Sequence, residues 1–403
     1  MQDGYLCGKR LRLPHIKKME NELELKWDRL RRAMVAEGVD GCLVTTNRNL
    51  YWLTGRVVNG YFYLPAEGAP RLFLKRPAET GIASTAIRKP EQLPEAFAQA
   101  GLPLPWRLML EDGTLPYNEY VRLQRSFAAS ETVGGSQLLR RLRMIKTPWE
   151  IEQMRLSARR QAEVYRMIPS CYRPGMTDLE LQIEIERLMR LHGSCGVFHA
   201  DGVNMEIFMG SLLAGANAEE PAPFDFALGG AGQDACLPLG ANGTRLEEGM
   251  AVMVDMAGNY TAYQSDMTRV FAVGQLPGEA LRAHAVSCDV TARMERTARP
   301  GVSCAQLYRD ALDRAAEAGL AANFMGTRLQ AKFVGHGIGL DVNELPVLTP
   351  RSQDVLQPGM TFAFEPKFVI PGVGAVGIEN TYLVTDEGVE KLTLLEEAIV
   401  PLT

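Results

Sequence analysis

The chain has 403 residues, of which 46% are hydrophobic and 23% are charged, and its net charge at pH 7 is −5. This length exceeds one ordinary core, so we expect two domains, and the composition excludes a disordered polymer. The mild acidity and the lack of any Lys/Arg run exclude an electrostatic reason for nucleic-acid binding.

Neither a membrane anchor nor a secretory route is indicated. No apolar stretch approaches the roughly 20 residues that span a bilayer. Residues 1–19 mix charged and apolar residues and lack the apolar run of a secretory signal. The seven cysteines are scattered without a Cys-x-x-Cys pair, which favours free thiols over a disulfide framework. We therefore expect a cytoplasmic protein that makes no contact with a membrane.

The first elements in chain order predict a mixed α/β unit. Apolar residues from Leu23 to Met34 recur at helical spacing and predict a helix over residues 21–38. An apolar strand is expected at 41–45. Residues 61–64 and 71–74 flank a turn that contains Pro and Gly, which predicts a hairpin.

A second unit is expected to begin near residue 146. The sequence Thr-Pro-Trp-Glu at 147–150 is a capping box that opens a helix. Farther on, residues 173–181 and 299–307 share the pattern Arg-Pro-Gly-x-(Thr/Ser)-x-x-(Glu/Gln)-Leu, a turn that leads into a capped helix. Capped helices can match by chance over nine residues, but the repeat favours a duplicated domain with a cleft where its halves meet.

Carboxylates then interrupt strands that are otherwise apolar. Asp255 ends the run Ala-Val-Met-Val, and the chain returns through Asp266 after a turn, so a hairpin brings the two carboxylates together. Carboxylates that face each other inside a sheet are costly unless a cation lies between them.

Three further candidate ligands follow. His336 lies in Gly-His-Gly-Ile-Gly, where the backbone can approach a bound group closely. Glu365 ends one apolar strand, and Glu379 lies within another, expected at 375–383. Four carboxylates and one imidazole suit two divalent ions that share a water, with Mn²⁺ favoured over Fe²⁺, Co²⁺ or Zn²⁺ by the oxygen-rich set.

Each candidate also has a purely structural explanation. An aspartate on a strand is commonly a turn or edge residue, and His336 can simply cap a strand. Glu365 or Glu379 can pair with Arg269 or Lys367. A metal centre accounts for all five residues at once, whereas the structural explanation needs five separate coincidences.

The motifs resemble those of the pita-bread metallopeptidases, which include methionine aminopeptidase, aminopeptidase P, prolidase and creatinase. All five candidates occur in the family's order across roughly residues 140–400, and Asn49–Gly55 is similar to the creatinase, prolidase and aminopeptidase P branch. The resemblance implies an α/β (α+β) fold with a creatinase-like N-terminal domain at 1–145 and a pseudo-symmetric pita-bread domain at 146–403. It also implies a homodimer in which the N-terminal domain lies near the partner's active site.

The resemblance implies a role for each candidate ligand. Asp255 and Asp266 would hold one metal ion, with Asp266 bridging to the second. His336 and Glu365 would complete the shell of the second ion, and Glu379 would bridge both. Glu365 also resembles the carboxylate that orients and deprotonates the attacking water.

The chain departs from the family at three positions that would contact the substrate. Leu239 and Asn343 stand where the peptidases carry histidines, and Gly377 stands where proline-specific members carry an arginine. The family's groups contact the scissile carbonyl, its tetrahedral intermediate or the substrate carboxylate. Asn343 can still donate a hydrogen bond, although it cannot transfer a proton.

Other features leave alternatives open. His199, on an expected strand, either reaches the cleft or is an ordinary buried or hydrogen-bonded histidine. Lys367, where many relatives carry glycine, either compensates for the missing arginine or lies exposed. The long segment 209–231 either shapes specificity or is a surface excursion.

The leading hypothesis is a metal-dependent hydrolase of a small peptide or amide, an Xaa-Pro aminopeptidase or Xaa-Pro dipeptidase with Glu365 as proton shuttle. The missing substrate groups keep open a non-peptide C–N hydrolase or a lyase on the same scaffold. A non-catalytic binding protein is a third hypothesis, which the intact set of five ligands disfavours.

Overall fold

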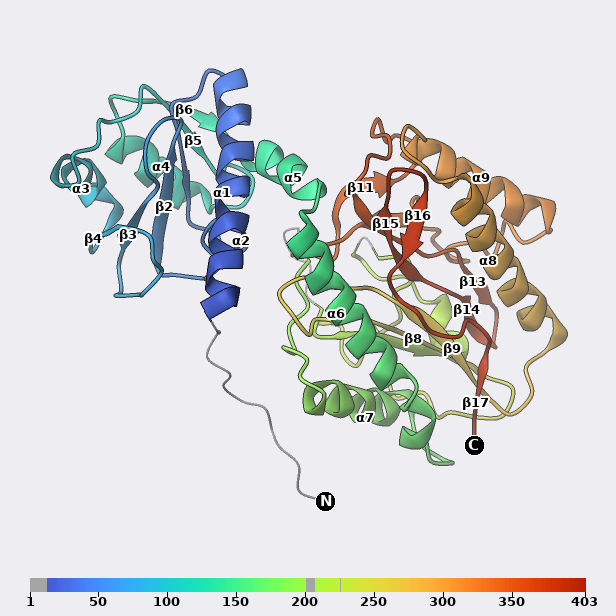
Figure 1. The fold of residues 1–403 in the computed structure, drawn as a ribbon. Coiled ribbons are helices and arrows are strands. Elements are labelled where there is room, and N and C mark those ends of the chain that lie inside the picture. Colours follow the sequence, from blue (N-terminus) through green and yellow to red (C-terminus); the bar gives the residue numbers. More distant parts are fainter. Residues whose placement is uncertain (1–12, 201–206, 225) are drawn as a thin grey trace. The chain divides into compact units, whose positions relative to one another are not determined.

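The computed structural model describes residues 13–200, 207–224 and 226–403, which form two compact units divided between Arg143 and Met144 (Figure 1). Residues 1–12 of the N-terminal stretch 1–19, for which the sequence predicts no secretory signal, lie outside the described residues. Residue 225 of the long segment 209–231 also lies outside them. None of the described helices combines the length and the apolar character needed to cross a membrane.

The first unit is a six-stranded mixed sheet with helices, in the strand order β4-β3-β2-β1-β5-β6. Its strands are β1 (Gly41–Val44), β2 (Gly60–Pro65), β3 (Arg71–Leu74), β4 (Ser84–Ala86), β5 (Arg107–Leu110) and β6 (Glu131–Gly134). Its helices are α1 (Leu13–Ala36), α2 (Asn47–Thr54), α3 (Leu93–Gln99), α4 (Tyr117–Ser126) and α5 (Ser136–Met144).

The predicted elements of this unit are confirmed, with one boundary wrong. The strand at β1 and the antiparallel β2–β3 hairpin form as expected. Helix α1 begins at Leu13, eight residues before the predicted start. Gly38, with φ of +64°, follows the helix end and supplies the left-handed turn.

The second unit packs helix pairs around three small sheets. Their orders are β11-β10-β12-β15-β16, β13-β14 and β17-β9-β8-β7. The helices are α6 (Pro148–Tyr165), α7 (Asp178–Leu191), α8 (Gly278–Thr297) and α9 (Cys304–Glu317). The strands are β7 (Gly210–Ala214), β8 (Ala251–Met256), β9 (Thr268–Val273), β10 (Gly335–Gly337), β11 (Glu344–Leu348), β12 (Thr361–Phe364), β13 (Lys367–Ile370), β14 (Gly374–Gly377), β15 (Asn380–Val384), β16 (Val389–Lys391) and β17 (Val400–Leu402).

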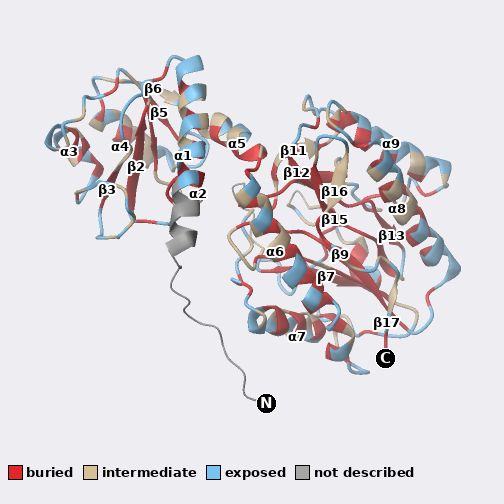
Figure 2. Ribbon diagram, in the orientation of Figure 1, coloured by how far each residue is buried: buried red, intermediate tan, exposed pale blue. Residues whose placement is uncertain are grey.

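Two hydrophobic cores lie on opposite sides of the strands in this unit. Helices α6 and α7 cover one side, and α8 and α9 cover the other (Figure 1). Along β9, Val270 packs into the α8–α9 core and Phe271 into the α6–α7 core, as the two-residue period of a strand requires. The strands are therefore buried from both sides, whereas the helices expose their outer faces (Figure 2).

The two copies of the repeat open α7 and α9, but only one forms the expected capping box. Thr177 and Glu180 cap each other's backbone groups at α7, as Thr147 and Glu150 do at α6. At α9 the side chain of Ser303 makes no capping bond. Gln306, the expected partner, donates instead to Asp310 one turn farther along the helix. Oε1 of Gln306, which the box would need as an acceptor for the backbone N–H of Ser303, accepts from Arg309 instead.

Breaks in two strands position the acidic residues. Glu365 and Pro366 separate β12 from β13, because proline has no backbone N–H to continue the ladder. The strand expected at 375–383 is in fact two strands, β14 and β15, interrupted at Ile378 and Glu379. At both breaks the carboxylate is freed from the regular alternation of the strand.

Candidate metal centre

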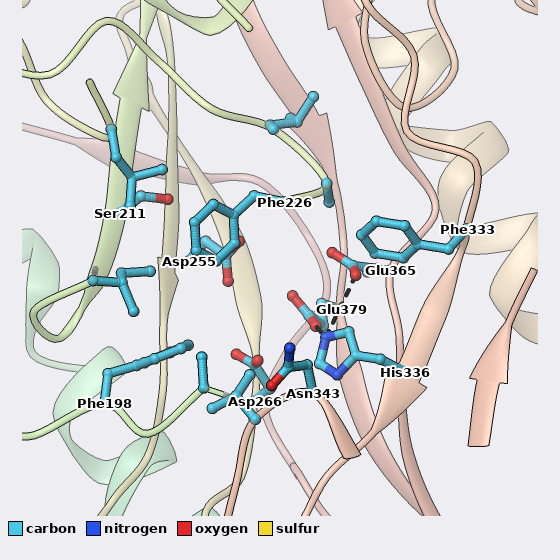
Figure 3. Close-up of a pocket in the computed structure, with 16 residues that line it drawn as sticks. Phe198, Ser211, Phe226, Asp255, Asp266, Phe333, His336, Asn343, Glu365 and Glu379 are labelled. Carbon is cyan, nitrogen blue, oxygen red and sulfur yellow. Dashed lines mark ion pairs between the residues drawn. The ribbon is translucent and has the colours of Figure 1, made fainter. Parts of the chain in front are cut away.

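The structure brings together all five residues that the sequence proposed as ligands. Asp255 lies near the end of β8, Asp266 lies just before β9, and His336 lies in β10. The two glutamates come from the strand breaks. The five side chains, drawn together in Figure 3, belong to the lining of one pocket.

Their ligand atoms form two triads that share one carboxylate. Asp266, His336 and Glu379 form the first triad, and Asp255, Glu365 and Glu379 form the second. Within each triad the ligand atoms lie within 4.8 Å of one another. Two groups joined through Glu379 reproduce the topology of a pair of cation sites with a bridging carboxylate.

The first triad fits a divalent ion. Nε2 of His336 lies 3.6 Å from Oε1 of Glu365 and 3.9 Å from Oε1 of Glu379, distances too long for hydrogen bonds (Figure 3). Oε1 of Glu379 is buried and has no hydrogen-bond partner among the described residues. A buried carboxylate oxygen of this kind needs a partner, and an ion held by this triad supplies one.

The second triad already surrounds a positive charge. Nζ of Lys367 donates to Oδ2 of Asp255 at 2.8 Å, to Oε2 of Glu365 at 2.7 Å and to Oε2 of Glu379 at 3.0 Å. The lysine side chain is completely buried. The sequence had offered a pairing of Glu365 or Glu379 with Lys367 as an alternative to metal binding, and this pairing is made. The alternative that Lys367 lies exposed is wrong, because β13 directs it inward.

Burial and crowding of charge shift the pKa values of the cluster. Burial, reinforced by the Asp255 carboxylate, raises the pKa of Asp266 well above its usual range. Burial, reinforced by Asp266 and Glu365, does the same to the pKa of Glu379. Burial alone would lower the pKa of Lys367, but the three carboxylates around it outweigh burial and raise that pKa. One ammonium therefore does not offset four carboxylates, and the site has room for further positive charge.

Neighbouring residues fix the orientation of the carboxylates. Oγ1 of Thr268 donates to Oε2 of Glu379 at 2.7 Å. The backbone N–H of Met267 donates to Oδ1 of Asp266 at 3.0 Å. Arg269, the other suggested partner for the glutamates, donates instead to the backbone carbonyl of Glu379. Such outer contacts hold ligands in place before an ion binds.

The substrate-side candidates separate into two groups. Leu239 and Asn343 line the pocket with the five ligands, whereas His199 and Gly377 are not among its lining residues. His199 is exposed, and its backbone carbonyl accepts from the N–H of Val342 at 2.7 Å. The strand expected around His199 does not form.

Gly377 has no room for the arginine of the proline-specific relatives. It lies opposite Lys367 in the β13–β14 pair, with φ of +137°. A Cβ there would approach the carbonyl oxygen of Pro366 to 2.7 Å and Cα of Lys367 to 3.0 Å. The backbone conformation at position 377 therefore excludes an arginine side chain.

Several pocket residues were not singled out from the sequence. Phe198, Phe226 and Phe333 line the pocket from different sides, and Ser211 of β7 lies opposite Asp255 in the sheet (Figure 3). Within the long segment 209–231, residues 226–228 line the pocket, which favours the specificity alternative over a surface excursion. The length of this segment and its Pro- and Gly-rich composition were the sequence features that could have indicated a role in the pocket.

The family is decided by comparison with known proteins. The model of metallopeptidase family M24 matches residues 152–386, which is more than half of the chain. The chain belongs to metallopeptidase family M24. The creatinase/prolidase N-terminal domain matches residues 26–145 of this M24 protein.

Relatives of the M24 protein extend over almost its whole length. It is 25% identical to the Xaa-Pro dipeptidase of Pyrococcus horikoshii over 91% of this chain and 96% of that relative. It is 26% identical to the uncharacterized peptidase YqhT of Bacillus subtilis over 92% and 98% of the two chains. The solved Xaa-Pro dipeptidase of Bacillus anthracis superposes with a TM-score of 0.78 at 25% identity, covering 94% of this chain and 100% of that one. The expected α/β fold with two domains of this family is confirmed.

Proposed function

We propose that the M24 protein is a metal-dependent hydrolase of small peptides or related amides, and most simply an Xaa-Pro dipeptidase or aminopeptidase. The observation that carries this proposal is the convergence of Asp266, His336 and Glu379 on one pocket. There, Oε1 of Glu379 lies near the imidazole and has no hydrogen-bond partner in the described part of the chain. The Xaa-Pro dipeptidases of Pyrococcus horikoshii and Bacillus anthracis, to which the chain is similar, support the substrate class.

The chain's own residues divide the chemistry among them. A divalent ion held by the first triad would polarise a substrate carbonyl and lower the pKa of water. Glu365 is the proposed proton shuttle, which accepts a proton from the attacking water and passes it to the leaving amine. Lys367 fixes one oxygen of Glu365, so the other oxygen, Oε1, stays on the His336 side of the carboxylate.

Substrate binding falls to the remaining pocket residues. The amide of Asn343 can donate a hydrogen bond to the substrate carbonyl in place of a histidine. Phe198, Phe226 and Phe333 offer apolar surface to a substrate side chain or proline ring. Leu239 adds apolar contact where the peptidases use a polar group.

Further properties belong to the same proposal. The oxygen-rich ligand set favours Mn²⁺ over Fe²⁺, Co²⁺ or Zn²⁺. The sequence predicted two such ions, and their number depends on Lys367. A homodimer and a cytoplasmic location are also expected, the first measurable by light scattering and the second by fractionation of cells.

The direct test is hydrolysis of a panel of Xaa-Pro dipeptides and tripeptides by Mn²⁺-loaded protein, with Xaa-Ala peptides for comparison. We expect release of the N-terminal residue that chelation abolishes, and no release by Asp266→Ala. Failure to cleave any peptide at measured full metal occupancy would contradict the peptidase assignment.

A second candidate is C–N bond hydrolysis of a non-peptide metabolite. It is favoured by Leu239 and by the backbone at Gly377, which together remove groups that hold a peptide carbonyl and carboxylate. A thermal-shift screen of small amides and amidines against the Mn²⁺-loaded protein distinguishes it from the first. Stabilisation by such metabolites, but not by Xaa-Pro peptides, would favour this candidate.

A further inference from the structure

We propose that the ammonium group of Lys367 permanently takes the place of one of the two metal ions, so that the protein binds a single divalent ion at Asp266, His336 and Glu379. The inference rests on the proposed metal-dependent function and changes its active centre. A centre of one metal ion and one lysine replaces the pair of ions that the sequence predicted.

The ammonium is saturated by the second triad. A protonated lysine has three N–H donors, and Lys367 meets three carboxylate oxygens within 3.0 Å, one each from Asp255, Glu365 and Glu379. These are the same three residues whose oxygens could otherwise hold an ion. The lysine thus satisfies both its own donors and the ligands of the second cation position.

An ion and the ammonium cannot share this position. A divalent ion lies roughly 2.0–2.2 Å from carboxylate oxygens. An ion bonded to the three oxygens that Lys367 contacts would therefore fall within the volume of Nζ. The two positive charges would also repel each other strongly at such a separation in a buried site.

Burial and backbone pairing oppose any movement of the Lys367 ammonium group away from the three carboxylates. Its side chain has 0% exposure, and its backbone is held in β13 by pairing with Gly377 and by a hydrogen bond from the N–H of Met325 to its carbonyl. Moving Nζ away from the carboxylates would leave a buried ammonium without charged partners, which is strongly unfavourable.

The first triad keeps its capacity for an ion. Glu379 divides its two oxygens, giving Oε2 to Lys367 while Oε1 remains without a hydrogen-bond partner in the described part of the chain. Glu379 would then bridge a lysine and a metal ion as it would otherwise bridge two ions. Charge balance agrees, since a divalent ion and an ammonium together offset most of the charge of four carboxylates.

The test is the number of Mn²⁺ ions per chain, measured by mass spectrometry of the full-length protein after anaerobic loading and removal of free metal. The variants are Lys367→Ala, which vacates the second position, and Lys332→Ala, which removes an exposed lysine as a matched control. We expect one ion per chain in the unaltered protein and in Lys332→Ala, and two in Lys367→Ala.

Each other result contradicts the inference in a recognisable way. Two ions in the unaltered protein would overturn it and leave the proposed hydrolase intact. One ion in folded Lys367→Ala would show that the lysine does not exclude the second ion. No ion in any protein would overturn both the inference and the proposed function. If Lys367→Ala does not fold, electron paramagnetic resonance of the unaltered protein still decides, because isolated Mn²⁺ supports the inference and a spin-coupled pair overturns it.

Discussion

Oε2 of Glu365 lies 2.7 Å from Nζ of Lys367, although Pro366 and a break between two strands separate the residues. The proposed proton shuttle is therefore tied to an internal cation by its own chain. We therefore expect replacement of Lys367 to affect both the proposed active centre and the stability of the fold.

Replacement of Lys367 by methionine should destabilise the metal-free protein. The change leaves two buried carboxylates and the partly exposed Asp255 without their cation, and loss of one partner of a buried ion pair costs about 3–5 kcal/mol. Chemical denaturation in the presence of a chelator measures the free energy of unfolding, with Lys332→Met as the exposed control. A loss below about 1 kcal/mol would show that the contacts of Lys367 matter little.

Replacement of His336 by alanine should nearly abolish binding of the single ion. Thr268→Val removes only the hydrogen bond to Oε2 of Glu379 and should weaken binding by about 10–100-fold, as changes to outer contacts do. His336→Ala removes a ligand and should exceed that effect. Isothermal titration with Mn²⁺ ranks the two variants. Equal affinity of His336→Ala and the unaltered protein would remove His336 from the ligand set.

Replacement of Glu365 by glutamine should separate catalysis from metal binding. Glu365 belongs to the triad that Lys367 fills, so the variant should keep its ion at the first triad. Loss of the shuttle should lower kcat by about 10²–10⁴-fold. Metal analysis and steady-state kinetics on the same preparation provide both readouts. Loss of the ion together with activity would instead make Glu365 a ligand.

Restoring the family's arginine at position 377 should fail. The left-handed backbone and the contact with the carbonyl of Pro366 oppose any side chain, and strain of this kind costs about 1–3 kcal/mol. Gly377→Ala should therefore lower the melting temperature, and Gly377→Arg should lower it at least as much. An arginine variant with unchanged melting temperature and a lower KM for Xaa-Pro peptides would show that position 377 does accept the side chain.

His284 should make stability fall on mild acidification. Burial, together with the nearby Arg269, lowers its pKa, while its contact with the backbone carbonyl of Glu397 and the charge of that residue act in the opposite direction. A depressed pKa in the folded state contributes stability that is present above the unfolded value near 6.5 and is lost as pH falls through the folded value. The melting temperature should thus drop less between pH 7 and pH 5 in His284→Gln. Identical profiles would contradict the prediction.

The proximity of the five candidate ligands could be predicted from the sequence because each lies in a short motif whose local geometry positions it. Asp255 and Asp266 share a hairpin, and His336 lies in a strand held close to its neighbours by glycines. The sequence around Lys367 did not show whether its side chain points into the protein or towards solvent. That direction depends on the break at Pro366 and on the pairing of β13 with Gly377, which lies on another strand.

The other residues that line the pocket could not be predicted from the sequence, because their positions also depend on distant parts of the chain. Phe198 and Phe226 come from segments without regular structure, so no period fixes which way they point. The strand expected around His199 lies in the same irregular segment as Phe198 and does not form. Ser211 reaches the pocket only because β7 pairs with β8 in a register that places it opposite Asp255.

The most direct measurement is an anomalous-scattering map of crystals of the Mn²⁺-loaded protein. We expect one peak, bounded by Asp266, His336 and Glu379, with Nζ of Lys367 still among Asp255, Glu365 and Glu379. Two peaks that share Glu379, with Lys367 displaced, would contradict the binding of a single ion.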